Sequence, residues 1–325
     1  MEYTQLGRTG LHVSKLCLGT MNFGSTTNKK EAFQIMDAAL DAGINFFDTA
    51  NNYGFLTEDW GITETILGEW FSQGGGRRER VVLATKVHED MHNAYDGPNT
   101  TPGLSIYKVR RHLEASLRRL QTDHLEIYYM HHIDRGVTWQ ENWDAFENLF
   151  QRGIIDYVGA SNFPAWQIAL AQCAAEKRNF MGIAVQQEQY SLLCRLPELE
   201  VLPACKALGI GTVAWGPLAG GLLAGLSEKG ARRASNSRNL SPQKQQKLDA
   251  YHSFCQQAGV PEAVMALAWT LQHPAMTAPV IGARTLQQLE SCIKALEVTL
   301  SPDMLAELDK IFPGPGGEAP EAYAW

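Results

Sequence analysis

Short apolar runs recur along the chain and are separated by longer stretches of mixed character. Each run is five to seven residues long, and most are rich in β-branched or aromatic residues and bounded by glycine or polar residues. This pattern is typical of buried β-strands. We expect eight strands, at 15–20, 44–49, 80–86, 125–131, 157–161, 183–187, 211–215 and 278–283.

The stretches between these runs carry the 3.6-residue period of amphipathic helices. Residues 31–42 begin with charged side chains and stop before Gly43, and glycine commonly follows the last residue of a helix. Apolar side chains repeat on one face of 106–120 and of 139–151 in the same way. The chain therefore alternates strands with helices.

This alternation predicts an α/β protein with a parallel sheet, because parallel strands need a crossover connection between them. Near-continuous apolar strands indicate that helices cover the sheet. Eight strands fit closure into a (β/α)₈ TIM barrel. The alternative is an open doubly wound sheet, but LGTMNFG after the first strand lacks the GxGxxG spacing. We expect one domain over residues 1–325.

Three features lie outside this repeat. The segment YTQLGRTGLHVSKL has two short extended runs around Gly-Arg-Thr-Gly and predicts an N-terminal β-hairpin over the bottom of the barrel. Long polar or glycine-rich loops are expected at 22–30, 88–105 and 222–243, and barrels place function in the loops that follow strands. Residues 313–325 are rich in proline and glycine, which predicts a mobile C-terminal tail.

Composition narrows the classes of function. A net charge of −7 argues against a nucleic-acid partner, because such surfaces are usually basic. The chain shows neither an apolar run of membrane-spanning length nor the pattern of a signal peptide. Its six cysteines are scattered without a CxxC pair, which favours reduced thiols and no metal site. We expect a cytoplasmic protein without a membrane partner, and its oligomeric state stays open.

Polar residues with catalytic potential lie at the ends of the predicted strands. Asp48 ends the second strand, Lys86 the third and His131 the fourth. Tyr53 follows in the loop after Asp48. A barrel brings the carboxyl ends of its strands to one pocket, where Lys86 can pair with a buried Asp48. Each residue taken alone has a structural explanation, such as a turn cap for Asp48 or packing for Tyr53.

Seven segments in order resemble the aldo-keto reductase superfamily over nearly the whole chain. They are INFFDTANNYG, LATK, YYMHHID, GIIDYVGASNF, QQEQYSLL, AWGPLAGGLLAG and PVIGARTLQQLE. The resemblance implies an NADP(H)-dependent oxidoreductase that reduces small aldehydes or ketones to alcohols by direct hydride transfer. The family's catalytic tetrad of Asp, Tyr, Lys and His falls on Asp48, Tyr53, Lys86 and His131.

These four residue types suit carbonyl reduction. A free tyrosine has a pKa near ~10 and is a weak acid at neutral pH, but a nearby lysine ammonium favours the phenolate. Asp48 would hold Lys86 in place and keep it charged. Tyr53 would then protonate the forming alkoxide as general acid, while His131 binds the substrate oxygen.

The resemblance also implies a site for the nicotinamide end of the cofactor. Ser161, Asn162 and Gln187 would hold the carboxamide, and Trp215 would stack on the ring. Gln187 is preferred to Gln186 because the family pattern is glutamine, two residues, then an aromatic residue.

The phosphate and adenosine ends fall on later segments. The glycine-rich run at 216–225 suits a pyrophosphate, because its backbone amides are not shielded by side chains. Arg284 suits a 2′-phosphate, and Arg238 offers a second cation, so NADPH is expected over NADH. The expected cofactor-binding residues are Thr20, Met21, Asp48, Ser161, Asn162, Gln187, Trp215, Gly216, Pro217, Leu218, Gly220, Arg238, Gly282, Arg284 and Gln288.

Three positions depart from many relatives. Leu226 stands where many carry lysine, and Ser291 and Cys292 stand where many carry Glu-Asn. These changes remove a phosphate cation and hydrogen bonds to adenine, so they argue against tight cofactor binding and weaken the preference for NADPH, but they leave the expected chemistry unchanged. An insert at 55–65 places Phe55 and Trp60 after Tyr53, where with Phe23 they suggest a hydrophobic substrate pocket.

Two other functions fit parts of the sequence. The chain also resembles the β subunits of voltage-gated potassium channels, which are best known as partners of another protein. That group typically has asparagine at the tetrad position of His131, so His131 favours a working reductase. A metal-dependent hydrolase could be assembled from His88, His92, His131, His132 and Asp134, but their spacing matches no known ligand pattern.

Overall fold

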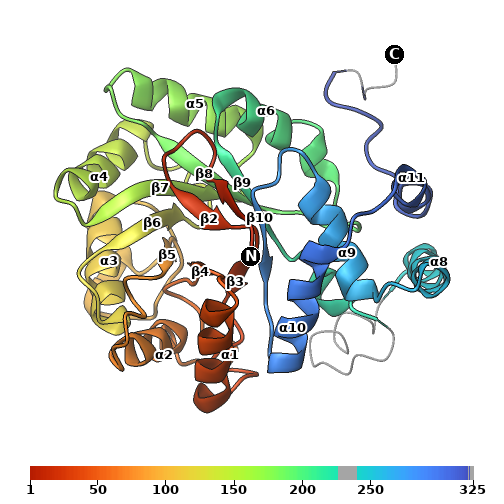
Figure 1. Ribbon diagram of the computed structural model, residues 1–325. Coiled ribbons are helices and arrows are strands. Elements are labelled where there is room, and N and C mark those ends of the chain that lie inside the picture. The colour runs from red at the N-terminus through yellow and green to blue at the C-terminus, as the bar shows by residue number, and fades with distance from the viewer. Residues whose placement is uncertain (226–239, 321, 323–325) are drawn as a thin grey trace.

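Parallel strands close into a barrel in the computed structural model of the protein, which describes residues 1–225, 240–320 and 322 (Figure 1). Within these residues eight strands pair in chain order, and the last pairs with the first. They are β3 (Cys17–Gly19), β4 (Phe46–Asp48), β5 (Val82–Val87), β6 (Leu125–Met130), β7 (Ile155–Ser161), β8 (Ile183–Gln189), β9 (Gly211–Trp215) and β10 (Ala278–Ile281). The (β/α)₈ barrel is confirmed.

The predicted strands agree with the observed strands to within two residues at each end. Two strands extend two residues beyond the prediction, β7 at its start and β8 at its end, where Glu188 and Gln189 pair with Ala214 and Trp215 of β9. The hydrogen-bonded ladder continues there although the side chains have become polar. An apolar run therefore underestimates the strand, because pairing depends on the backbone and not on hydrophobicity.

Helices surround the barrel on its outside (Figure 1). The predictions at 106–120 and 139–151 are confirmed by α3 and α4, whereas α1 starts two residues early because the Asn28 side chain accepts a hydrogen bond from the Glu31 N–H (3.0 Å). None of the described helices combines the length and the apolar character needed to cross a membrane. The helices are α1 (Lys29–Asp41), α2 (Ile62–Phe71), α3 (Ile106–Leu120), α4 (Trp139–Gln151), α5 (Ala165–Glu176), α6 (Val201–Leu208), α8 (Pro242–Ala258), α9 (Glu262–Gln272), α10 (Leu286–Lys294) and α11 (Pro302–Ile311).

Alternate strand residues point into the barrel and out towards the helices. Phe46 and Val82 belong to the apolar cluster inside the barrel, whereas Phe47 packs in the cluster beneath the helices. Because strand side chains alternate with a period of two, Asp48 and Lys86 share the inward phase of Phe46 and Val82. The strands therefore carry both charges into the interior.

The N-terminal hairpin covers one end of the barrel, as predicted. Its strands β1 (Tyr3–Gln5) and β2 (His12–Ser14) are antiparallel. Val13 packs with the apolar cluster inside the barrel, and the Arg8 N–H donates to the carbonyl of Gly209, which lies just before β9 (2.8 Å). The hairpin thus closes the N-terminal end of the strands and leaves the opposite end for the loops (Figure 1).

The long loops differ in how much of them is described. The loop after β5 contains the 3₁₀ segment η1 (Ala94–Asn99), and α8 takes the end of the predicted loop 222–243. In the described part of the C-terminal tail, the Ala319 N–H donates to the Leu199 carbonyl (2.9 Å). The mobility of the tail and the single-domain organisation stay predictions.

A buried carboxylate fixes two helices against β5. Glu64 of α2 is fully buried and accepts from Thr85 Oγ1 of β5 (2.6 Å). Its second oxygen accepts from Arg119 Nε of α3 (2.8 Å). The strand that carries Lys86 is therefore held from outside by a satisfied ionic contact.

Replacing Trp143 by alanine should lower the free energy of unfolding by about 3–5 kcal/mol. The indole is fully buried, stacks on Trp139 and donates from Nε1 to the Ala171 carbonyl (3.0 Å), so its loss leaves a cavity between α4 and α5. The matched control is Trp166→Ala, because that side chain is 53% exposed. Urea titration followed by circular dichroism measures both variants, and equal midpoints would contradict the packing described.

Candidate active site

A buried ion pair lies at the carboxyl ends of β4 and β5. Lys86 Nζ is 2.5 Å from Asp48 Oδ2, and the exposed fractions of the two residues are 0% and 1%. Nζ also donates to the Thr49 carbonyl (2.8 Å) and to Tyr53 Oη (3.1 Å). The ammonium therefore has three oxygen partners, which offsets the cost of removing it from water.

The environment of Lys86 keeps it positively charged. Burial disfavours the ammonium, but attraction by Asp48 and Tyr53 outweighs burial, and the pKa of Lys86 is raised. Its ammonium also lies 4.9 Å from the centre of the Tyr53 ring and 5.8 Å from that of Tyr129. A fixed positive charge beside a phenol favours the phenolate form of that phenol.

His131 stands beside Tyr53 at the end of β6. The two rings meet edge to face with their centres 6.2 Å apart. Burial lowers the pKa of His131 well below its ordinary value, and the charge of Lys86 adds to this effect. The imidazole is therefore neutral at neutral pH. Its Nδ1 atom is buried and has no hydrogen-bond partner among the described residues.

Asn162 connects three strand ends beside the tetrad. Its backbone has a positive φ of 60°, and its Nδ2 donates to the His131 carbonyl (3.1 Å) and to Ser161 Oγ (3.0 Å). Its Oδ1 accepts from Trp215 Nε1 (2.9 Å). Ser161, Asn162 and Trp215, which come from β7 and β9, are thus brought together as the sequence suggested.

Gln187 lies inside the barrel, whereas Gln186 points outwards. Gln187 follows the inward phase of Val185 and donates from Nε2 to Asp48 Oδ1 (2.7 Å). Gln186 instead donates to Glu188 Oε2 (2.8 Å). Gln187 therefore occupies the interior end of β8 and also supports the carboxylate of the ion pair, a contact that the sequence did not indicate.

The loop after β9 provides backbone without side-chain bulk. Gly216 and Gly220 have φ of 67° and 64°, a conformation that favours glycine. A Cβ added at Gly216 would meet no atom within 4 Å, so the backbone there faces open space. Pro217 is buried, while Leu218 is half-buried beside it. This segment fits a dinucleotide phosphate, which needs accessible amide groups.

Residues of the expected adenosine end lie at the start of α10. The Arg284 N–H donates to Gln288 Oε1 (3.0 Å), and the Gly282 carbonyl accepts from Asn22 Nδ2 (2.8 Å). Arg284 is half-buried, and its guanidinium forms no ion pair with any described residue. A cation without an acidic partner at a helix N-terminus fits a phosphate.

Other expected cofactor and pocket residues differ in their placement. Thr20 is buried and donates from Oγ1 to the Asp48 carbonyl (2.9 Å), and Met21 is half-buried beside it. Phe23 is fully buried in the core beneath the helices, so the prediction that it lines a substrate pocket is wrong. Cys292 also packs in that core. Leu226 and Arg238 lie outside the described residues.

Two residues beside the tetrad were missed by sequence reasoning. Tyr129 is fully buried, and its register opposite Lys86 places it directly below the ammonium. Asn51 is fully buried, and its N–H donates to the Lys86 carbonyl (3.3 Å). The inward phase of β6 could have indicated Tyr129, whereas the contacts of Asn51 leave no trace in a single sequence.

The histidines near the site were the alternative metal ligands. The rings of His131 and His132 stack at 5.0 Å, and His88 lies 5.4 Å from His132. Glu89 contacts both His88 and His132. Among the residues that the structure describes, no three histidine, cysteine or acidic side chains are arranged to hold a metal ion.

Comparison with known proteins identifies the family. Residues 15–312 match the model of the Aldo/keto reductase family. The chain is 57% identical to an uncharacterized oxidoreductase, YrpG, of Bacillus subtilis over the full length of both. It is 33% identical to norsolorinic acid reductase stcV of Emericella nidulans, over 94% of this chain and 79% of that protein. It is 32% identical to a probable voltage-gated potassium channel subunit beta of Oryza sativa, over 96% of each. The chain therefore belongs to the aldo/keto reductase family.

Proposed function

We propose that the protein reduces aldehydes or ketones to alcohols with NADPH, and that Tyr53 is the general acid. The observation that carries this proposal is the buried contact of Lys86 with both Asp48 and Tyr53, next to a neutral His131. Membership of a family of oxidoreductases, together with this geometry, favours an enzyme.

Tyr53 would protonate the alkoxide that forms when the carbonyl is reduced. After it gives up its proton, the phenolate is stabilised by Lys86 Nζ, which lies 3.1 Å from Oη. Asp48 prevents Lys86 from losing its charge, and Gln187 and Thr20 in turn hold Asp48. The low-dielectric interior strengthens each of these interactions.

His131 would orient the substrate oxygen without changing its own charge. A neutral imidazole can donate one hydrogen bond and does not compete with Lys86 as a second cation. The Tyr53 hydroxyl and His131 together could then bind one carbonyl oxygen from two sides. A misplacement of about 1 Å in such a pair can cost ~100-fold in rate.

NADPH, when bound, would supply the hydride that the carbonyl carbon accepts. Ser161, Asn162 and Trp215 would hold the nicotinamide end at the strand ends, and the backbone around Gly216 would accommodate the phosphates. Arg284 would bind the 2′-phosphate.

All six cysteines are free, which supports a cytoplasmic location.

A cofactor-binding regulatory subunit is the second candidate. The relative that favours it is named a probable potassium channel subunit beta and covers nearly the whole chain. The presence of His131 with the other three tetrad residues favours catalysis. Binding of NADPH without turnover of any carbonyl compound would favour the regulatory function.

Replacing Tyr53 by phenylalanine should lower kcat about 100- to 10,000-fold, because the general acid is lost. The affinity for NADPH should stay within about twofold. The loss of NADPH absorbance with a reactive aldehyde measures turnover, and fluorescence titration measures binding. Tyr3→Phe, on the hairpin at the opposite end of the barrel, is the control. Equal rates for wild type and Tyr53→Phe would contradict the assigned acid.

The pH dependence should show no ionisation of His131 between about pH 6 and 8. Its pKa is held well below 6.5 by burial, so the neutral form persists across this range and protonates only at lower pH. Profiles of kcat/KM for wild type and His131→Asn would test this. The variant should be slower at every pH, and its profile between about pH 6 and 8 should have the same shape as that of wild type. A limb near pH 6.5 that disappears in His131→Asn would show that this assignment is wrong.

Replacing Arg284 by alanine should weaken NADPH binding about 10- to 100-fold, because hydrogen bonds to a charged phosphate are lost. NADH lacks the 2′-phosphate, so its affinity should change little. Lys294→Ala removes a cation from the exposed last turn of the same helix and serves as control. The two dissociation constants are measured by nicotinamide fluorescence. Equal weakening of both cofactors would contradict the assigned contact.

A further inference from the structure

The turn that carries Tyr53 is attached to the barrel mainly through its backbone. The Thr49 N–H donates to the Ala84 carbonyl (2.8 Å), and the Asn51 N–H donates to the Lys86 carbonyl (3.3 Å). The side-chain oxygens of Thr49, Asn51 and Asn52 are buried and have no hydrogen-bond partner among the described residues. The hydrogen bond made by the Asn51 side-chain nitrogen is therefore important for holding this turn in place.

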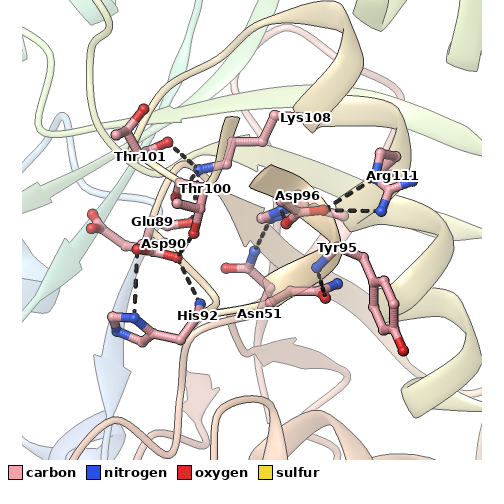
Figure 2. Close-up of polar contacts among 12 residues, drawn as sticks. Asn51, Glu89, Asp90, His92, Tyr95, Asp96, Thr100, Thr101, Lys108 and Arg111 are labelled. Carbon is pink, nitrogen blue, oxygen red and sulfur yellow. Dashed lines mark hydrogen bonds and ion pairs between the residues drawn. The ribbon is translucent and has the colours of Figure 1, made fainter. Parts of the chain in front are cut away.

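That anchor leads out of the barrel to α3. Asn51 Nδ2 lies 3.1 Å from His112 Nδ1, and His112 Nε2 lies 3.2 Å from Asp96 Oδ2. Asp96 belongs to η1 in the loop after β5, and its Oδ1 accepts from Arg111 Nη2 (3.0 Å). Figure 2 shows Asn51, Asp96 and Arg111 converging from three segments of the chain.

The hydrogen-bond donors and acceptors that link Asn51, His112 and Asp96 allow only one arrangement of protons. The Asn51 NH₂ group can only donate, so His112 Nδ1 must accept. The Asp96 carboxylate can only accept, so His112 Nε2 must carry the proton. Burial lowers the pKa of His112, and the single proton of a neutral imidazole satisfies both contacts.

A second set of contacts fixes the loop that holds Asp96. Lys108 of α3 is 2% exposed, and its Nζ lies within hydrogen-bond distance of four backbone carbonyls at the two ends of the loop. These belong to His88, Glu89, Thr100 and Thr101, at 2.5–3.3 Å. Figure 2 shows Lys108 beside Glu89, Thr100 and Thr101. Asp96 is thereby held at a defined position over α3.

We propose that His112 is a positioning residue for Tyr53, because its bridge from Asp96 to Asn51 fixes the turn that presents the phenol to Lys86 and His131. This inference rests on the proposed function and deepens it. Since Asp96 lies in the loop after β5, the docked loop becomes part of the support for the acid. His112 acts on Tyr53 through Asn51 and the turn, and it touches no reacting atom itself.

Protonation of His112 at low pH should rearrange the contact between His112 and Asn51. A protonated His112 also donates from Nδ1, which would then face the Asn51 NH₂ group. The amide must rotate so that its buried Oδ1, which lacks a partner, accepts instead. The charges around His112 are Asp96 from the loop and Lys108 and Arg119 from α3, with Glu64 of α2 on Arg119.

The first test compares His112→Phe with Tyr128→Phe. Phenylalanine removes both contacts of His112, whereas Tyr128→Phe removes a different buried hydrogen bond between β6 and α3, from Oη to the Val109 carbonyl (3.2 Å). We expect His112→Phe to lower kcat about 10- to 100-fold, with the dissociation constant for NADPH within about twofold. Tyr128→Phe should lower the melting temperature but leave kcat unchanged. Equal effects of the two variants on kcat would reduce His112 to a structural role and overturn the proposal.

A conservative substitution and a double variant sharpen this test. Asp96→Asn keeps an oxygen that can accept from His112 Nε2, so its kcat should stay within about threefold of wild type. Asn51→Leu combined with His112→Phe should be no slower than the slower single variant, because the two residues act as one unit. Multiplied losses in the double variant would contradict a shared anchor.

Two readouts do not depend on turnover. ¹⁵N NMR of labelled histidine should find His112 neutral, with its proton on Nε2, at pH 7, and Asn51→Leu should perturb that signal. Crystal structures should keep Lys86 Nζ and Tyr53 Oη within hydrogen-bond distance in Tyr128→Phe and separate them beyond about 3.5 Å in His112→Phe. If wild type shows no turnover but these structural results hold, the proposed reduction fails and the anchor stands. If the phenol stays in place in His112→Phe, the anchor fails whatever the activity.

Discussion

The structure depends on a lysine ammonium that is buried inside the barrel. Removing such a group from water costs several kcal/mol, so Lys86 is tolerated only because Asp48, the Thr49 carbonyl and Tyr53 surround it. Asp48 above all must be held rigidly, since losing its carboxylate would leave an uncompensated charge. The closed sheet provides this rigidity by joining β4 to β5 through three residue pairs that end at Asp48.

The same constraint explains the electrostatics of the neighbouring groups. A fixed positive charge in a low-dielectric interior disfavours a second cation nearby, and His131 accordingly stays neutral. It also favours an anion, and Tyr53 is the group placed to become one. One charge pair thus sets different protonation states for two side chains that lie edge to face.

The support for this pair extends beyond the barrel wall. Glu64 connects α2 and α3 to β5, and Asn51 connects the turn after β4 to α3. The loop after β5 contributes through Asp96 and is closed at its base by Lys108. Polar contacts therefore connect the loop after β5 to α3 and to the strand ends. A change in this loop can thus alter the position of the tetrad residues without contacting them directly.

The sequence by itself determined the repeat of strands and helices, because hydrophobic periodicity records which side chains are buried. It also indicated Asp48, Tyr53, Lys86 and His131, since residues at strand ends must converge once the sheet is parallel. It did not predict that Gln187 supports Asp48 or that Phe23 is buried in the core. Only the tertiary structure decided these contacts and the bridge through His112, because they join segments whose separation along the chain carries no periodic signal.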